Sequence, residues 1–391
     1  MWPGEKVLDG KRENACEILV AVRKYQIAGC LGNPLSVLTS PRATPFGPTY
    51  FVSVRGTVMK ASQRPRRTQS HQILLRAESL EERRLLSASV NRPIGIAALD
   101  TSDPTAGFVD GDRQPPLTSA EVFNLQSKPD SNFTIYLDFD GHVTTGTDWN
   151  FYFEVDTIVS PAFDLDGDAT TFGAMELQRI LLSWQRTAED FAPFDVNVTT
   201  RDPGIDALIN SGAGDTKWGN RSVVSVDNFA DCGCGGFAFL ESFGDPLGAP
   251  SFVFNKGEDS LGETFSHEVG HTLGLFHDGL NNGGQEYYGG HGSGALGWGP
   301  IMGAPFTRNI TQWDRGEYFD SSNQFDIDLD IITTLNGFGY RVDDYGNTRP
   351  TAGNLTVSNL TNVDAFGIIE RNTDIDYFKF ETGGGNVSFN I

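Results

Sequence analysis

HEVGHTLGLFH, residues 267–277, is the stretch of sequence around which the rest of the chain is organised. If residues 264–274 form a helix, His267 and His271 are four positions apart and project from the same face. Two imidazoles in this arrangement can bind one zinc ion. Glu268 lies beside them, where its carboxylate can take a proton from a zinc-bound water.

Both ends of this helix can be predicted. Ser260, with Glu263 three residues later, predicts a capping box at its start. Gly274 falls where the helix should stop, because glycine accepts the left-handed conformation of a sharp turn. That turn brings His277 back toward the metal as a third ligand. Three protein ligands leave a fourth position open for water, which is the arrangement of a catalytic zinc site.

The pattern H-E-x-x-H-x-x-G-x-x-H resembles the zinc motif of the metzincin metalloproteases, and Asp278 after the third histidine is similar to the reprolysin-like branch. Metzincins also carry a methionine in a turn below the zinc. Met302 lies among glycine and proline in residues 298–303, which predicts such a turn. The resemblance implies that Met302 supports the site without binding metal. Ala304 stands where some metzincins have a tyrosine ligand, so that role is not carried over.

The order of predicted elements indicates an α/β domain at residues 131–340. The first strand, at 133–139, is followed by a helix at 174–191 whose apolar residues form one stripe. Four further strands precede the zinc helix, and a glycine-rich loop and a final helix follow it. These elements are expected at residues 196–200, 222–226, 237–240, 251–254, 283–303 and 325–335. The resemblance implies a metzincin-like domain with a mixed, mostly parallel twisted sheet.

Charge is distributed unevenly along the 391 residues, whose net charge is −22. Residues 1–90 hold 14 of the 29 Lys and Arg but 7 of the 51 Asp and Glu, so residues 91–391 carry a net charge of −29. An acidic body argues against nucleic-acid binding, which needs a basic face. It suits a secreted protein that binds calcium. No apolar run is long enough to predict a membrane span.

The N-terminal region, residues 1–90, is predicted to be a disordered sorting or targeting region, with residues 1–58 an overextended start. Residues 78–88 resemble the Leu-Glu-x-Arg-x-Leu-Leu-Ser signature on exported proteins of some bacteria, which implies an extracellular or cell-surface location. The alternative is a short amphipathic helix. Residues 91–130 are rich in Asp, Pro and Ser, and this composition predicts a linker or pro-segment.

The C-terminal segment, residues 341–391, changes to a β-rich pattern. Strands are expected at residues 374–380 and 386–389. The segment resembles the first half of the bacterial pre-peptidase C-terminal domain, a β-sandwich appended to secreted proteases. It is too short for the whole sandwich, so we expect an incomplete module belonging to a longer protein.

A second metal site is predicted at Asp164, Asp166 and Asp168. These carboxylates alternate along a loop that contains Gly167, and calcium prefers such oxygen ligands. The pattern lacks the glutamate that ends an EF-hand loop. A solvated acidic turn is the alternative.

Three other features leave alternatives open. Cys232 and Cys234 can form a small disulfide ring, stay as free thiols or bind a second metal. Asp138 and Asp140 mimic the Asp-x-Asp-Gly signature of haloacid dehalogenase phosphatases, but the zinc motif would then be unexplained. His291, in the glycine-rich loop, is either a surface histidine or a substrate contact.

The sequence therefore predicts a secreted, zinc-dependent endopeptidase that acts on protein or peptide substrates. The alternative is a non-catalytic surface or adhesion protein on a metzincin scaffold. The presence of Glu268 argues against that alternative, because a scaffold that has lost catalysis has no need of the general base.

Overall fold

A computed structural model describes residues 16–22, 42–44, 47–49, 75–77, 117–225, 227–354 and 367–382. The chain divides into two units, Gln69–Tyr340 and Met1–Thr68 together with Arg341–Ile391. The first unit carries every residue of the predicted zinc site. The predicted sorting signature at 78–88 lies outside the described residues.

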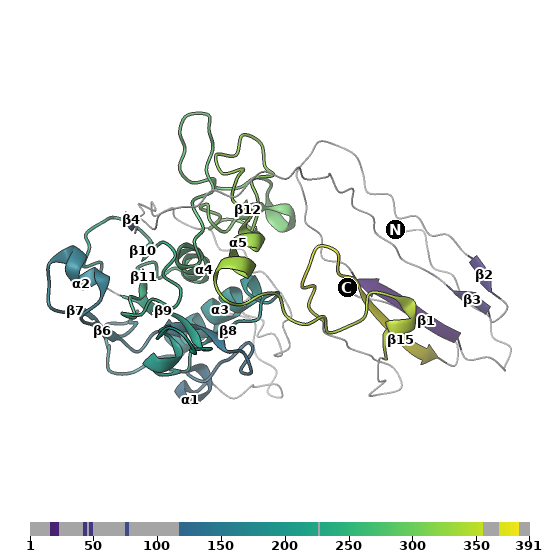
Figure 1. Cartoon of the computed structure of the whole chain (residues 1–391), viewed down its shortest axis with the longest axis horizontal. Coiled ribbons are helices and arrows are strands. Elements are labelled where there is room, and N and C mark those ends of the chain that lie inside the picture. Colours follow the sequence, from purple (N-terminus) through teal and green to yellow (C-terminus); the bar gives the residue numbers. More distant parts are fainter. Residues whose placement is uncertain are drawn as a thin grey trace, which may run out of the picture. The chain divides into compact units, whose positions relative to one another are not determined.

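The larger unit is built on a six-stranded sheet (Figure 1) of order β4-β10-β11-β9-β5-β8. The pairs β5–β8, β5–β9 and β9–β11 are parallel, whereas β10 runs antiparallel to both β11 and β4. The sheet is thus mixed and mostly parallel, which confirms the predicted α/β class. The strands are β4 (Leu75–Ala77), β5 (Phe133–Asp138), β8 (Asn197–Thr199), β9 (Trp218–Val224), β10 (Gly236–Phe239) and β11 (Ser251–Val253).

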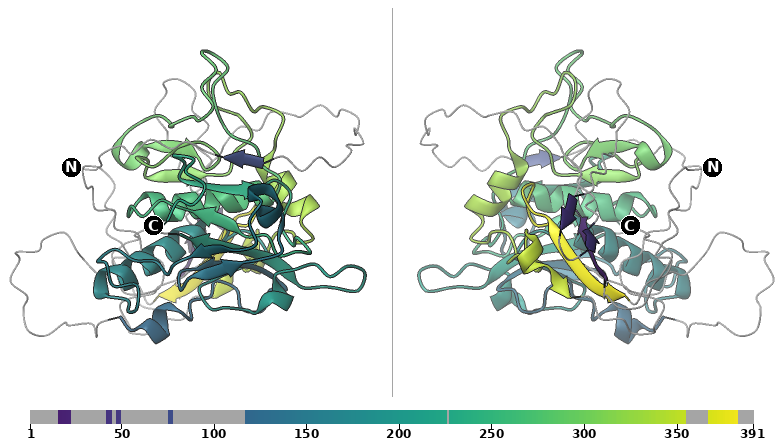
Figure 2. Two further views of the ribbon diagram at one scale, coloured as in Figure 1. Left: turned by 90° about the vertical axis from the view of Figure 1, so that its left-hand side faces the viewer. Right: turned by 90° about the vertical axis from the view of Figure 1, so that its right-hand side faces the viewer.

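Two helices pack against one another, α3 (Ala174–Asp190) and α4 (Ser260–Thr272), and the two views of Figure 2 show them side by side. Arg186 of α3 holds the start of α4, since its guanidinium donates to the Asp259 carboxylate at 3.0 Å and to Glu263 at 3.1 Å. The predicted capping box is therefore wrong. The N-cap is Asp259, with no side-chain cap bond, and Glu263 pairs with Arg186 instead.

The core lies between α4 and the sheet. Phe265 and Val269 of α4 and Leu273, directly after it, are buried in one cluster with Phe139, which follows β5. The rings of Phe139 and Phe265 pack edge to face, with centroids 5.4 Å apart. Burying each such side chain contributes about 1.5–3 kcal/mol. The helix that carries the zinc motif is therefore held rigidly on the sheet.

The segment after α4 consists mainly of loops and short elements. β12 (Trp298–Pro300) pairs in parallel with β13 (Ile310–Gln312). The last helix of the unit is α5 (Asp328–Leu335), which begins later than the predicted residue 325. Phe325 is 93% exposed. The apolar residues that suggested an earlier start therefore do not face the core.

Small elements that the sequence pattern did not predict complete the unit. Around Trp149, whose indole donates to the Pro250 carbonyl at 2.7 Å, an aromatic cluster includes Phe237 and Phe252. The small elements that the sequence pattern did not predict are α1 (Ser119–Val122), β6 (His142–Thr144), α2 (Asp148–Phe153), β7 (Ile158–Ser160), η1 (Ile205–Ala207) and η2 (Gly294–Leu296).

The second unit contains a three-stranded sheet of order β1-β15-β14. β15 (Asp376–Thr382) lies two residues beyond the strand predicted at 374–380 and pairs antiparallel with β1 (Cys16–Val22). β14 (Gly353–Asn354), which follows η3 (Arg349–Thr351), pairs with β15 in parallel. β2 (Arg42–Thr44) and β3 (Gly47–Thr49) form a separate hairpin. The strand predicted at 386–389 lies outside the described residues.

Among the described residues, no helix combines the length and apolarity that a membrane crossing requires.

Candidate metal centre

Three histidine side chains converge at the end of α4. His267 and His271 project from the same face of the helix, and His277 comes from the segment that follows it. The Nε2 atoms of His271 and His277 lie 3.1 Å apart, and one nitrogen of each ring lies within 4.8 Å of the others. All three side chains are buried. The structure thus brings together the three residues that the spacing predicted.

The turn at Gly274 returns the chain to the helix. Its φ of +99° is left-handed, a conformation in which a Cβ would be strained. The amide of Gly274 donates to the His271 carbonyl at 2.9 Å, and the amide of Leu275 donates to the Gly270 carbonyl at 3.0 Å. These bonds close the last turn of α4. They set the direction in which the chain leaves the helix, and so the position of His277.

The other nitrogen of each ring meets an oxygen acceptor. Nδ1 of His267 lies 2.8 Å from the Ile301 carbonyl, and Nδ1 of His271 lies 2.7 Å from the Leu275 carbonyl. Nδ1 of His277 lies 2.9 Å from Oε1 of Glu286. A carbonyl or carboxylate only accepts, so each neutral ring carries its proton on Nδ1. The lone pair is then on Nε2, which is the atom that binds a metal.

This donor set fits zinc. Zinc–nitrogen bonds of about 2.0–2.1 Å in a tetrahedral site separate the nitrogens by about 3.3 Å. The distance of 3.1 Å between Nε2 of His271 and Nε2 of His277 is close to that value. Two unprotonated nitrogens at this distance repel each other, and a cation between them removes the repulsion.

Glu268 is completely buried and lies against β10. A Cβ on Gly236, the first residue of β10, would come within 2.5 Å of Oε1 of Glu268. Only glycine at this position therefore leaves room for the carboxylate beside the strand. A glycine inside a strand often marks a close approach of another group, which is the one weak sign of this contact in the sequence.

Met302 lies beneath α4. A turn closed by the bond from the Gly303 amide to the Pro300 carbonyl at 3.0 Å places it there, and its side chain is completely buried. Its sulfur packs so closely against Gly270 that a Cβ on that glycine would collide with it. The Met302 carbonyl accepts from the Asp278 amide at 2.8 Å, which links this turn to the residue after His277.

Sequence reasoning missed two residues of the glycine-rich loop. Glu286 holds the His277 ring, and the Tyr287 ring packs against it with centroids 4.5 Å apart. Neither residue has a periodic relation to the histidine motif, so no pattern could have identified them. In the same loop, His291 lies 3.0 Å from the Tyr288 hydroxyl and packs on Trp298.

The predicted calcium loop folds differently from its expected ligand arrangement. Asp164 and Asp166 approach Glu176 of α3, whereas Asp168 binds the hydroxyls of Thr170 and Thr171. Oδ1 of Asp164 accepts from the amides of residues 166 and 167 at 2.9 and 2.7 Å. Oxygen atoms of the predicted calcium ligands thus accept hydrogen bonds from the loop itself. Calcium at this loop stays a prediction.

Two further sequence alternatives can be compared with the structure. Cys232 and Cys234 are joined in a disulfide, which leaves them neither as free thiols nor as metal ligands. Asp138 is completely buried and pairs with Arg221. This pairing gives Asp138 a structural role in the interior and argues against the haloacid dehalogenase interpretation, in which the same carboxylate would attack phosphate.

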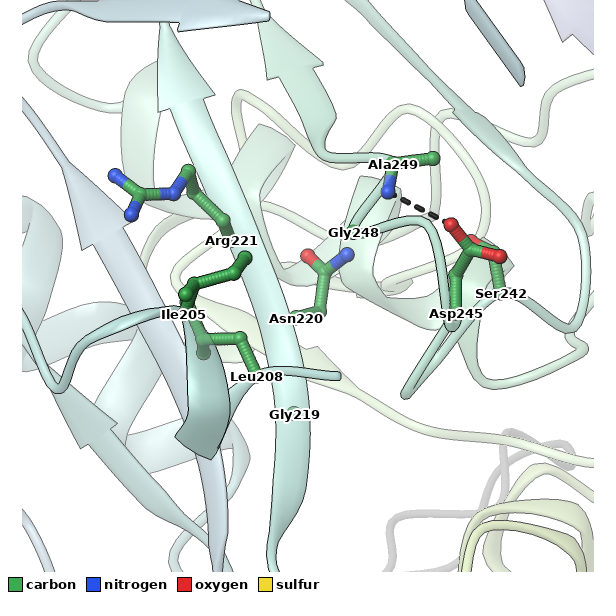
Figure 3. A pocket seen from close by; sticks show the side chains of 9 residues that line it. All are labelled: Ile205, Leu208, Gly219, Asn220, Arg221, Ser242, Asp245, Gly248 and Ala249. Carbon is green, nitrogen blue, oxygen red and sulfur yellow. Dashed lines mark hydrogen bonds between the residues drawn. The ribbon is translucent and has the colours of Figure 1, made fainter. Parts of the chain in front are cut away.

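A hollow lies away from the histidines, between β9 and the loop that precedes β11 (Figure 3). In it Asp245 accepts from the Ala249 amide at 2.8 Å, and burial raises the pKa of Asp245 above its ordinary value. None of the three histidines lines this hollow.

The Peptidase M66 family matches residues 241–345 of the chain. The matched segment contains the whole of α4, all three histidines, Glu268 and Met302. No curated protein matches the chain. The family match supports a protease of the metallopeptidase type, with a metal as its cofactor.

Proposed function

We propose that the protein is a secreted zinc endopeptidase, located outside the cell or on its surface, that hydrolyses peptide bonds. The observation that carries this proposal is the convergence of three buried imidazoles whose second nitrogens all face oxygen acceptors. A surface histidine cluster would need neither the burial nor the fixed tautomers. The match to the Peptidase M66 family supports the same assignment.

His267, His271 and His277 would hold the zinc ion through Nε2. Zinc bound there would make a water molecule acidic enough to lose a proton near neutral pH and would polarise the scissile carbonyl. The acceptors on the three Nδ1 atoms orient the rings and keep them neutral. Met302 supports the helix below the rings without serving as a ligand.

Glu268 is the general base of the proposed mechanism. Its carboxylate takes the proton of the attacking water and passes it to the amine that leaves. The side chain neighbours His267 on α4 and is confined by Gly236 of β10. A carboxylate buried in this position needs little reorganisation during proton transfer.

The strand beside Glu268, β10, already holds an extended segment of the chain on its outer side. β10 pairs on one side with β11 and on the other with β4, a short extended segment of the same chain. An antiparallel extended segment is bound there through main-chain hydrogen bonds, which any peptide can supply. A peptide substrate that bound to β10 in the same way would replace β4.

The proposal is tested with Glu268→Gln, which keeps the shape of the side chain and removes the base. We expect the variant to retain one zinc per chain and to cleave casein about 10²–10⁴-fold more slowly than the parent. Glu258→Gln, at an exposed position just before α4, is the control and should stay fully active. Equal cleavage by Glu268→Gln and the parent would exclude the mechanism. A parent protein that binds zinc but cleaves no member of a peptide library would favour the non-catalytic surface protein.

A further inference from the structure

Three acidic side chains outside the histidine site meet in the interior. They are Asp278, which follows His277 directly, Asp314, which comes two residues after β13, and Asp328, the first residue of α5. One carboxylate oxygen of each lies within 4.8 Å of the others. The exposed fractions of the three residues are 1%, 8% and 1%. Three segments far apart in the sequence thus bring negative groups to one buried point.

Within the described residues, two of the oxygen atoms of these carboxylates accept no hydrogen bond. The Gly316 amide donates to Oδ1 of Asp314 at 2.6 Å, and the Asp314 amide donates to Oδ2 of Asp328 at 2.9 Å. Oδ2 of Asp278 and Oδ2 of Asp314 are buried and have no hydrogen-bond partner within the described part of the chain. A buried polar atom without a partner is costly, so these two oxygens point to a ligand.

No described basic side chain forms an ion pair with the cluster, although the charge of Arg315 acts on Asp314. Within the described residues, none of the three carboxylates forms an ion pair with Lys, Arg or His, and Arg315 pairs with Glu317. Asp326, whose carboxylate accepts from Asn323 at 3.2 Å, adds a fourth negative group nearby. Like charges repel strongly inside a protein. A bound cation would remove that repulsion.

We propose that Asp278, Asp314 and Asp328 bind a divalent cation of the calcium type, at a site separate from the three histidines. Carboxylate oxygens are the ligands that calcium prefers, whereas zinc prefers nitrogen and sulfur. Magnesium usually retains several waters, and a buried site offers little room for them. This site differs from the loop of Asp164, whose side chain is partly exposed.

The cation joins three parts of the domain. The Asp278 amide donates to the Met302 carbonyl at 2.8 Å, and its carbonyl accepts from the Tyr288 amide at 2.7 Å. Asp314 and Asp328 are linked to each other by two main-chain contacts, the bond to Oδ2 and the bond from the Asp328 amide to the Asp314 carbonyl at 3.1 Å. A cation among the carboxylates fixes the segment after His277, the turn of Met302 and the start of α5 against one another.

The test measures bound calcium in the full-length chain purified with zinc. Parent, Asp314→Asn and Asp328→Asn are dialysed against the same free calcium and analysed for both metals by mass spectrometry. We expect each variant to hold one calcium fewer per chain than the parent and the same amount of zinc. Asp330→Asn, an exposed change on the same helix, should match the parent. Calcium bound elsewhere on this acidic chain contributes equally to parent and variants, so it does not affect the difference in calcium content between them.

Thermal unfolding gives a readout that does not depend on activity. Calcium should raise the melting temperature of the parent and of Asp330→Asn by more than that of Asp314→Asn. Without calcium, Asp314→Asn should be at least as stable as the parent, because one of the repelling charges is gone. Terbium luminescence excited through Trp313, next to Asp314 in the sequence, extends the test to the unmodified protein and should be abolished by calcium.

Three results would overturn the proposal. The first is equal calcium content in the parent and both asparagine variants. The second is a calcium-free Asp314→Asn that unfolds well below the calcium-free parent, since the carboxylates would then stabilise the fold without a cation. The third is binding of magnesium as tight as that of calcium, which would exclude the calcium type. Zinc content in the same samples reports separately on the histidine site.

Discussion

At the scale of single residues, the histidine site depends on groups that do not bind the metal. Glu286 is the clearest of them, because its carboxylate lies 2.9 Å from Nδ1 of His277. We expect Glu286→Ala to weaken zinc binding by about 10–100-fold, as is usual when the partner of a ligating histidine is removed. Glu286→Gln, which still offers an oxygen acceptor, should lose less. Competition with a chelator measures both, and an unchanged affinity for Glu286→Ala would contradict the role of this carboxylate.

Gly236 supports a second prediction at this scale. A Cβ at Gly236 would lie 2.5 Å from Oε1 of Glu268 and 2.6 Å from the Phe252 carbonyl. Gly236→Ala should therefore displace the carboxylate and lower kcat by about 10²-fold, the usual effect of a 1 Å error in position. Zinc content should not change. Gly339→Ala, where no atom lies within 4 Å of the added Cβ, is the control. Parent-like kcat in Gly236→Ala would show that the glycine has no part in placing Glu268.

The residues of the site differ in how far the sequence reveals them. The three histidines and Glu268 could be predicted because one helix and one turn fix their spacing. Glu286, Gly236, Asp314 and Asp328 reach the same region from separate segments, and their positions depend on tertiary packing. Asp278 stands in the motif itself, yet only the fold shows that it meets two further carboxylates.

At the scale of elements, a buried cluster of titratable and charged side chains lies at the end of β5 and the start of β6. Asp138 pairs with Arg221, and Nδ1 of His142 lies 4.0 Å from Oδ2 of Asp138. Burial, with Arg221 nearby, lowers the pKa of His142 to about 4. Burial raises the pKa of Asp138 to about 7, although Arg221 acts in the opposite direction. The two groups therefore have opposite effects on how stability depends on pH.

Replacing His142 separates these effects. A histidine whose pKa falls from 6.5 to about 4 on folding stabilises the protein above pH 6.5, and this stability is lost as the pH falls toward 4. We expect His142→Gln to gain about 1–2 kcal/mol relative to the parent between pH 7 and pH 5. Urea unfolding at the two pH values measures the difference. The same substitution at His291, far from this group in the sequence, is the control, and a parent-like pH dependence for His142→Gln would contradict the prediction.

Elements with a strong periodic pattern were predicted well, whereas short ones were not. The strands β5, β8, β9, β10 and β11 and the helices α3 and α4 all lie at or near their expected positions. α2, β6 and β7 were missed because their contacts are aromatic and distant, as with Trp149 and Phe239, whose rings stack at 3.9 Å. The predicted start of α5 was too early, since residues 325 and 327 are apolar but exposed.

At the scale of the whole molecule, some pairings join parts of the chain too far apart for a local pattern to indicate them. β1 pairs with β15 along seven residues on each strand, although residues 1–90 were expected to be disordered. The chain divides after Tyr340, and the peptidase domain expected at residues 131–340 stays a prediction. Hydrophobic periodicity identifies a strand without identifying its partner, which explains why this pairing could not be predicted.

The larger unit should also depend on its metal for stability. The proposed zinc ion joins α4 to His277, on the segment that continues to Met302, so it binds the folded state only. At a free zinc concentration 1,000 times the dissociation constant, this linkage stabilises the fold by about 4 kcal/mol. At constant free calcium, we expect dialysis against a zinc-selective chelator to lower the melting temperature by several degrees and added zinc to restore it. His271→Ala should melt near the chelated parent and gain nothing from zinc. A chelated parent that melts with the zinc-loaded protein would mean that the three imidazoles hold no metal of structural consequence.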